Sequence, residues 1–298
     1  MDLFLTIVID GVIYASWLFI VALGLTLIFG VLRILNIAHG SLYAIGAYSA
    51  ASAVTLASGL GLPPAFSLIA MLLAALAVAV VVAPILERGL LRLFYGRDVV
   101  LVLLVTYAVF LILEDASKLI WGVNPYFVIE PRQVFGDVVL GDLFYVGYDL
   151  MLILLAVFCG VVVWLWLNRT TQGKIVLAVI HNRNIAAAMG VNVSRVYLLA
   201  FTVGVFLAAL GGAFTSPLIS VQPGISVSVI IVSFAVVIIG GLGSIVGAAI
   251  GALIVGLARA WAIYQFPAAE IFVVYLVRAL VLLYRREGLF PRQESRKI

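Results

Sequence analysis

The amino-acid sequence predicts an all-α fold: a polytopic integral membrane bundle of helices that lies almost entirely within a lipid bilayer. Of the 298 residues, 66% are hydrophobic and only 10% are charged, whereas soluble domains carry about 45–50% apolar and about 25% charged residues. The apolar residues form stretches close to the ~20 that a helix needs to cross a bilayer. No stretch shows the alternation of a barrel strand. We therefore expect one transmembrane domain over residues 1–298 and no separate soluble domain.

Charged residues and Gly- and Pro-rich breaks divide the chain into candidate spans. The first is long, about 43 Å as a helix, so we expect it to be tilted or broken near Gly24 or Gly30. The seventh is short for a crossing and is a candidate for a broken or re-entrant helix. The prediction is therefore 8–9 spans, drawn from residues 3–31, 41–58, 64–85, 98–120, 149–167, 196–216, 227–241, 245–263 and 269–284.

The distribution of the charges predicts an orientation. Thirteen of the 17 Lys and Arg residues, but only four of the 13 Asp and Glu residues, fall in alternate segments between the spans. Segments rich in Lys and Arg face the cytoplasm. We therefore expect the N-terminus outside and the C-terminal tail, residues 285–298, in the cytoplasm. The net charge of +4 reflects this asymmetry, and we expect no nucleic-acid partner.

Two loops are long enough to have a role of their own. The external loop, about 121–148, mixes Pro, Gly, Asp and aromatic residues and is suited to short hairpins. The internal loop, about 168–195, is basic and contains an Ala-rich stretch long enough for one or two helical turns. Such a segment either docks to a cytoplasmic partner or merely connects two spans, and its residues alone leave both readings open.

Signatures of enzymes and cofactors are missing from the sequence. It has two histidines and one cysteine, so zinc sites of the HExxH or CxxC kind are excluded. There is no GxSxG elbow, and residues 172–175 lack the earlier glycine and the hydroxyl residue of a phosphate loop. We expect no catalytic residues, no metal and no cofactor in this chain.

Polar residues within or between the spans are the candidates for a transport pathway. Asn36, His39 and Ser41 interrupt apolar sequence between the first two spans. They can satisfy backbone groups at a break in a helix, or line a cavity, and one segment can do both. The substrate-pathway candidates are Tyr14, Asn36, His39, Ser41, Thr106 and Tyr107.

Small residues recur every four positions in two spans. Such stripes let helix backbones approach closely, and packing is a more frequent role for them than contact with a ligand. Residues 40–42 with 46–47 also resemble residues 243–245 with 247–248, which indicates a weak internal repeat. The packing candidates are Gly204, Gly212, Gly243, Gly247 and Gly251.

Ionisable residues inside a membrane are candidates for function. Glu114 and Lys118 lie one helical turn apart, where they could pair with each other, and Arg259 could pair with Glu270 across the turn between the last two spans. Three charges within or near spans, those of Glu114, Asp115 and Arg278, support an alternative function, that of a self-sufficient channel or secondary carrier for a small neutral or zwitterionic solute.

The order of the motifs resembles the LivH-type permeases of branched-chain amino-acid ABC importers. The first motif runs from Ala22 to Val31 and on through Asn36 to Tyr43, and it continues with Gly46, Ala47 and Tyr48. The second runs from Ile239 to Ile245, followed by Gly247 and Ala248, and residues 288–290 resemble the closing motif. The internal loop fits the family at Thr171, Gly173, Ala187, Gly190, Val191 and Asn192.

The resemblance implies a permease subunit of an ATP-driven importer in the bacterial inner membrane, with half of a translocation pathway for branched-chain or other amino acids. It implies four partners besides membrane lipid: a LivM-type permease, two cytoplasmic ATPases that bind ATP and Mg, and an external solute-binding protein. It also implies that a coupling helix in the internal loop contacts an ATPase. That segment comprises Ile185, Ala186, Ala187, Ala188, Met189, Gly190, Val191 and Asn192.

Overall fold

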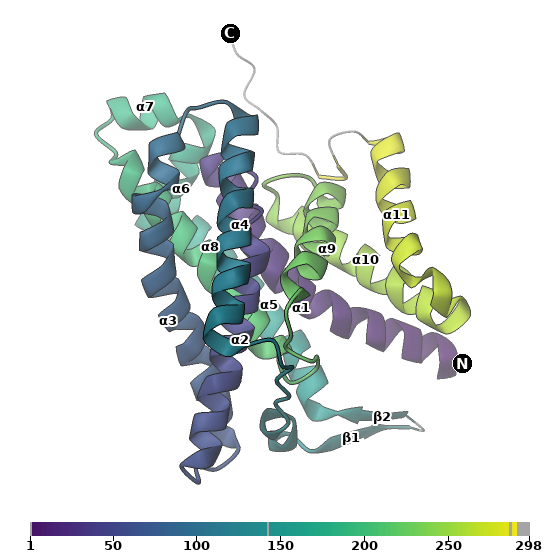
Figure 1. Ribbon diagram of the computed structural model, residues 1–298. Coiled ribbons are helices and arrows are strands. Elements are labelled where there is room, and N and C mark those ends of the chain that lie inside the picture. The colour runs from purple at the N-terminus through teal and green to yellow at the C-terminus, as the bar shows by residue number, and fades with distance from the viewer. Residues whose placement is uncertain (1, 142, 286–287, 291–298) are drawn as a thin grey trace.

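The computed structural model describes residues 2–141, 143–285 and 288–290, and it confirms the all-α class (Figure 1). Most of the predicted cytoplasmic tail lies outside the described residues. The helices are α1 (Asp2–Leu32), α2 (His39–Gly59), α3 (Ala65–Gly89), α4 (Val99–Trp121), α5 (Gly147–Arg169), α6 (Thr171–His181), α7 (Arg183–Ala188), α8 (Val193–Thr215), α9 (Ile225–Gly240), α10 (Ile245–Gln265) and α11 (Glu270–Tyr284). Three 3-10 turns, η1 (Leu91–Phe94), η2 (Glu130–Val134) and η3 (Pro267–Ala269), and the strands β1 (Asp137–Leu140) and β2 (Leu143–Val146) complete the described chain.

Each of the nine predicted spans corresponds to a helix, namely α1 to α5 and α8 to α11. By length and composition, six helices of the described chain can cross a membrane: α1, α3, α4, α5, α8 and α10. As expected, α9 is short, with 16 residues. The number of crossings stays a prediction.

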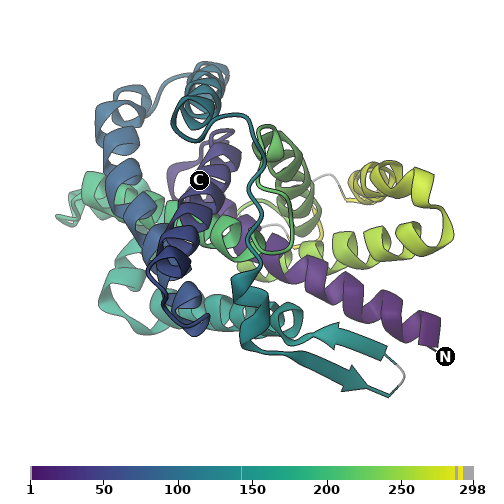
Figure 2. The same ribbon diagram turned by 60° about the horizontal axis from the view of Figure 1, so that its bottom comes forward.

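The centre of the bundle is formed by α1 and α8. Helix α1 packs against α5, α8, α9 and α10, while α8 also packs against α2 and α3. In the most apolar stretch of α1, 83% of the residues are buried, against 22% in α4. Figures 1 and 2 show α3 and α4 on the opposite side of the molecule from α10 and α11. The two central helices are thus more buried than the other long apolar helices of the described chain.

Of the two alternatives expected for the first span, the break is wrong, and the tilt stays a prediction. Helix α1 is continuous through Gly24 and Gly30 to Leu32, and the chain turns at Arg33, whose φ is 58°. It then folds back along α1, so that His39 Nε2 donates to the carbonyl oxygen of Val21 at 3.0 Å. About 16 Å of helix separates Val21 from Leu32. Helix α2 therefore begins inside the bundle, and the irregular backbone lies between two helices.

The two ends of the molecule are named here for their landmarks, the α7 end and the hairpin end (Figure 1). At the hairpin end, β1 and β2 pair antiparallel, with Asp137 opposite Val146, which confirms the predicted hairpin. At the α7 end, the predicted loop 168–195 is largely helical and includes α6, which the residue pattern did not predict. Thr170 marks its start, because its Oγ1 accepts from Gly173 N at 3.0 Å as a helix cap.

Candidate functional site

The polar residues near residue 39 hold the irregular backbone in place. Thr106 Oγ1 donates to Leu35 O at 3.1 Å, and Ser41 Oγ donates to Phe110 O at 3.1 Å. Both bonds join α4 to the segment around the start of α2. Two buried nitrogens, His39 Nδ1 and Asn36 Nδ2, have no protein hydrogen-bond partner. Such groups are rare in folded interiors.

Helix α9 also begins inside the molecule, and its N-terminus is capped from another helix. The carboxylate of Glu114 on α4 accepts from Gly224 N at 2.8 Å and from the hydroxyl of Ser226. The predicted pair between Glu114 and Lys118 is wrong, because Lys118 pairs instead with Asp115, at 2.9 Å. A helix N-terminus presents free N–H groups and a partial positive charge, which attract a carboxylate.

The α9–α11 cavity, as we name it, is an opening of about 450 Å³ between α1, α9 and α11. The expected ion pair between Arg259 and Glu270 is confirmed and lines this cavity. The guanidinium carbon of Arg259 lies 4.0 Å from the ring centre of Tyr14, and Trp17 packs edge to face on Tyr14 at 5.0 Å. The cavity combines one charged pair, an aromatic wall and aliphatic side chains.

The predicted pathway residues do not gather in one place. Tyr14 lines the α9–α11 cavity, whereas Asn36, His39, Ser41 and Thr106 are buried near the start of α2. Tyr107 is 47% exposed and stacks on Phe110. The sequence predicts the pairing of Arg259 with Glu270 but not that both residues line a cavity with Tyr14. The signal was present: two opposite charges embedded in apolar sequence.

Helix α7 presents an apolar surface at one end of the molecule. Ile185 is 62% exposed and Met189 is 81% exposed, while Ala186 is buried and anchors the turn. Asn182 caps the helix, since its Oδ1 accepts from the backbone N–H groups of residues 184 and 185. Gly190 then reverses the chain at a φ of 86°. The predicted coupling stretch thus covers the second half of α7, the turn after it, and Asn192, which caps α8.

Arginine side chains lie beside the start of α7. A cavity of about 410 Å³ beside it is lined by Arg33, Arg97, His181 and Arg183. On its wall the phenol of Tyr95 donates to the buried carboxylate of Glu87 at 3.0 Å. Burial, followed by the charge of Glu87, raises the pKa of Tyr95 above its ordinary value, so the phenol keeps its proton. This end therefore carries both exposed apolar groups and positive charge.

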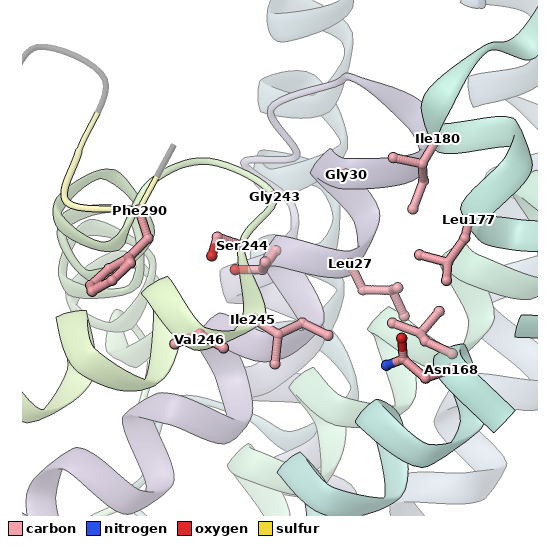
Figure 3. Close-up of a pocket in the computed structure, with 12 residues that line it drawn as sticks. Leu27, Gly30, Asn168, Leu177, Ile180, Gly243, Ser244, Ile245, Val246 and Phe290 are labelled. Carbon is pink, nitrogen blue, oxygen red and sulfur yellow. The ribbon is translucent and has the colours of Figure 1, made fainter. Parts of the chain in front are cut away.

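Three motifs that are distant in the sequence meet at the α7 end. Gly243 lies against Gly30, since a Cβ at Gly243 would stand 3.4 Å from Gly30 Cα. Ser244 caps α10 by accepting from Gly247 N at 3.0 Å, and Phe290 N donates to Gly240 O at 3.0 Å. Figure 3 shows Gly243, Ser244 and Phe290 around a cavity of about 390 Å³, with Leu27 and Gly30 of α1 among the residues that line it.

The remaining glycines of the predicted stripes lie at contacts between helices. A Cβ at Gly212 would collide with the carbonyl of Tyr43, and one at Gly251 with that of Val236. Gly247 lies against Gly240, and Gly204 lies against Ile28 and Gly24. The two copies of the weak internal repeat differ in the role of their serine. Ser41 donates to α4, whereas Ser244 caps its own helix.

A bundle of apolar helices with interrupted elements inside it and a helix exposed at one end is the architecture of a membrane permease. The model of the family described as the branched-chain amino acid transport system permease component matches residues 7–284. The chain belongs to this family.

Two relatives match over nearly their whole length. The chain is 29% identical to the high-affinity branched-chain amino acid transport system permease protein BraD of Pseudomonas aeruginosa, covering 97% of this chain and 96% of that protein. It is 26% identical to the permease protein LivH of the corresponding system in Escherichia coli, covering 99% and 98%. Among solved structures, PsaBC from Streptococcus pneumoniae in complex with Fab matches 92% of this chain and 89% of that chain, with 15% identity and a TM-score of 0.44.

Proposed function

We propose that this chain is the permease subunit of an ATP-driven ABC importer and forms half of the translocation pathway for a small solute, a branched-chain or other amino acid. Family membership and the printed functions of BraD and LivH support the class of solute. The structural observation that carries the proposal is α7, which holds Ile185 and Met189 exposed beside a cationic surface. An exposed apolar pair on a capped helix is suited to a groove on a partner protein.

In this proposal the α7 end is cytoplasmic and contacts the ATPases. The excess of Lys and Arg in the segments at this end supports the orientation, which places the N-terminus outside and the chain in the bacterial inner membrane. The partner ATPases bind ATP and Mg, and this chain has no ATPase site of its own. A LivM-type permease supplies the other half of the pathway, and an external solute-binding protein delivers the solute to the hairpin end.

Purification from native membranes tests the assembly. With an affinity tag on this chain, we expect an ATPase and a second permease to be retained at fixed stoichiometry, identified by mass spectrometry of the intact complex. Liposomes that contain this chain alone should show no uptake. Uptake without ATP by the isolated chain would establish the alternative, a self-sufficient channel or secondary carrier.

The substitution Gly190→Pro tests coupling through α7. Proline cannot adopt the φ of 86° found here, and it removes the N–H that donates to Ala187 O at 3.0 Å. We expect ATP hydrolysis by the complex to persist while uptake falls by at least about tenfold.

Gly61→Pro is the matched control for this experiment. Gly61 has a φ of 71°, has open space around it, and donates to Ser58 O at 2.9 Å, but it lies at the hairpin end. Both variants introduce the same local strain, so a specific loss of coupling should appear only in Gly190→Pro. Equal uptake by the two variants would remove α7 from the mechanism.

A further inference from the structure

We propose that the α9–α11 cavity binds the amino acid itself by its main-chain charges, with Arg259 receiving the carboxylate and Glu270 the ammonium group. This inference rests on the proposed function and assigns residues to the solute. It concerns a low-affinity site inside the permease, separate from any site on a solute-binding protein.

The ion pair is the first observation. Arg259 lies on α10 and Glu270 is the first residue of α11, and the two side chains are 29% and 32% exposed. Both line the cavity, so a solute within it can reach both charges. Charged residues are expensive inside a membrane and concentrate at sites of transport.

The setting of Arg259 is the second observation. The guanidinium lies on the face of Tyr14, 4.0 Å from the ring centre, and Trp17 supports Tyr14 from the side at 5.0 Å. This contact between the guanidinium and the ring does not involve Glu270, so it can persist when Glu270 takes another partner. A planar guanidinium can bind both oxygens of a carboxylate at once. Arg259 is thus held in position for a carboxylate that replaces Glu270.

The cavity contains one positive and one negative side chain, Arg259 and Glu270, and this combination favours a zwitterionic solute. A solute that carries both charges replaces one ion pair by two, and no charge is left without a partner. A simple amine or a simple acid would leave either Arg259 or Glu270 unpaired in a partly buried site, which is costly. The cavity therefore discriminates by the number and sign of main-chain charges.

The walls match an aliphatic side chain. Val229, Val232 and Val274 line the cavity. Among the described residues that line it, the hydroxyl groups other than those of the tyrosines belong to Ser220 and Ser228. Its volume of about 450 Å³ falls within the usual range for small-molecule sites. An aliphatic amino acid can place its side chain on the valines while its main-chain groups reach the ion pair.

Binding to the purified permease complex in nanodiscs tests the site. The probes are L-leucine, 3-methylbutylamine, which lacks the carboxylate, and 4-methylpentanoate, which lacks the amine. For the wild type we expect L-leucine to bind at least about tenfold more tightly than either analogue, measured by competition with labelled leucine. Equal affinity for all three compounds would overturn the site.

Two substitutions remove the charges singly. In Arg259→Gln we expect L-leucine to bind no more tightly than 3-methylbutylamine, and in Glu270→Gln no more tightly than 4-methylpentanoate. A purely structural ion pair would instead weaken all three compounds together, or none, and either result contradicts the proposal. Lys118→Gln removes a member of an ion pair outside the cavity and should leave all three affinities unchanged.

Loss of the fold is separated from loss of the site by a second set of variants. Arg259→Lys and Glu270→Asp keep both charges, so their melting temperatures should stay near that of the wild type while the affinity for L-leucine falls at least about threefold because the geometry changes. Unchanged affinity in both of these variants would contradict the assigned contacts.

The same preparation distinguishes this inference from the proposed function. ATP-dependent uptake of leucine by the wild type, together with equal affinities of the wild-type permease for the three compounds, would overturn only the site. Absence of ATP-dependent uptake by the wild-type complex, supplied with its binding protein, would overturn the function.

Discussion

The contact between α1 and α8 and the cavity between α9 and α11 use opposite kinds of residue. In the contact, a Cβ at Gly24 would stand 2.6 Å from Gly204 O, so only glycine lets the two backbones meet. In the cavity, the large side chains of Tyr14, Trp17 and Arg259 occupy the surface that faces α9 and α11. One helix, α1, takes part in both regions.

The difference shows that close helix packing and an open cavity require different residues in a bundle that lacks a strong hydrophobic driving force between its helices. Lipid tails are as apolar as leucine, so helices in a membrane associate through close packing and hydrogen bonds. Small residues provide such packing where the helices must not move apart. Bulky and charged residues leave space between the helices, as in the α9–α11 cavity.

The largest effect is expected for Gly204→Leu, which tests whether the α1–α8 contact tolerates any side chain. A Cβ at this position would already collide with Ile28 and approach Gly24 O, and overpacking of this kind costs about 1–3 kcal/mol or more. We expect little folded protein, measured by size-exclusion chromatography of the detergent-solubilised chain. Gly59→Leu is the control, because this glycine has open space around it, and this variant should elute as the wild type does. A normal elution profile for both Gly204→Leu and Gly59→Leu would show that the α1–α8 contact is not close-packed.

A smaller effect is expected for Glu114→Gln, which tests the capped start of α9 on the cavity side. The amide keeps one acceptor but loses the charge that faces Gly224 N and the Ser226 hydroxyl. Hydrogen bonds to charged groups contribute about 1.5–3 kcal/mol, so thermal unfolding should occur at a clearly lower temperature. Asp115→Asn changes the neighbouring exposed carboxylate and should lower the unfolding temperature far less. Equal shifts of the unfolding temperature in the two variants would contradict the role of Glu114 as a cap.

The smallest effect is expected for Ser244→Ala, at the start of α10, the helix that packs on α1 and also carries Arg259. Loss of the bond from Gly247 N to Ser244 Oγ should destabilise the protein by about 1 kcal/mol. Ser117→Ala is the control, because that hydroxyl donates within α4 to Leu113 O, at 2.8 Å, and caps nothing. Thermal unfolding monitored by a thiol-independent dye or by intrinsic tryptophan fluorescence checks both; a larger shift for Ser117→Ala would contradict the assignment.

Local patterns in the sequence were sufficient for most of the fold. Apolar stretches predict nine of the helices, the Pro, Gly and Asp residues of the loop 121–148 predict a hairpin, and the Ala-rich stretch predicts α7. Each depends on residues that are near one another in the chain. The pairing of Arg259 with Glu270 is of the same kind, because only a short turn separates the two helices.

Contacts between distant residues could not be predicted in this way. Lys118 is the sequence neighbour of both Glu114 and Asp115, and nothing local reveals that Glu114 instead caps α9, more than 100 residues further on. The continuity of α1 also depends on contacts with residues that are distant in the sequence. Gly24 and Gly30 look like breaks in isolation, but they serve as contact points for Gly204 and Gly243.

The sequence by itself determined the class of the protein, the helices and the family motifs, because hydrophobicity, turn chemistry and motif order are properties of the chain. Only the tertiary structure decided where α2 and α9 begin, which carboxylate caps which helix, and that Tyr14 stacks on Arg259 beside Glu270. The physical reason is that burial and charge pairing depend on distances in space, and chain folding sets those distances.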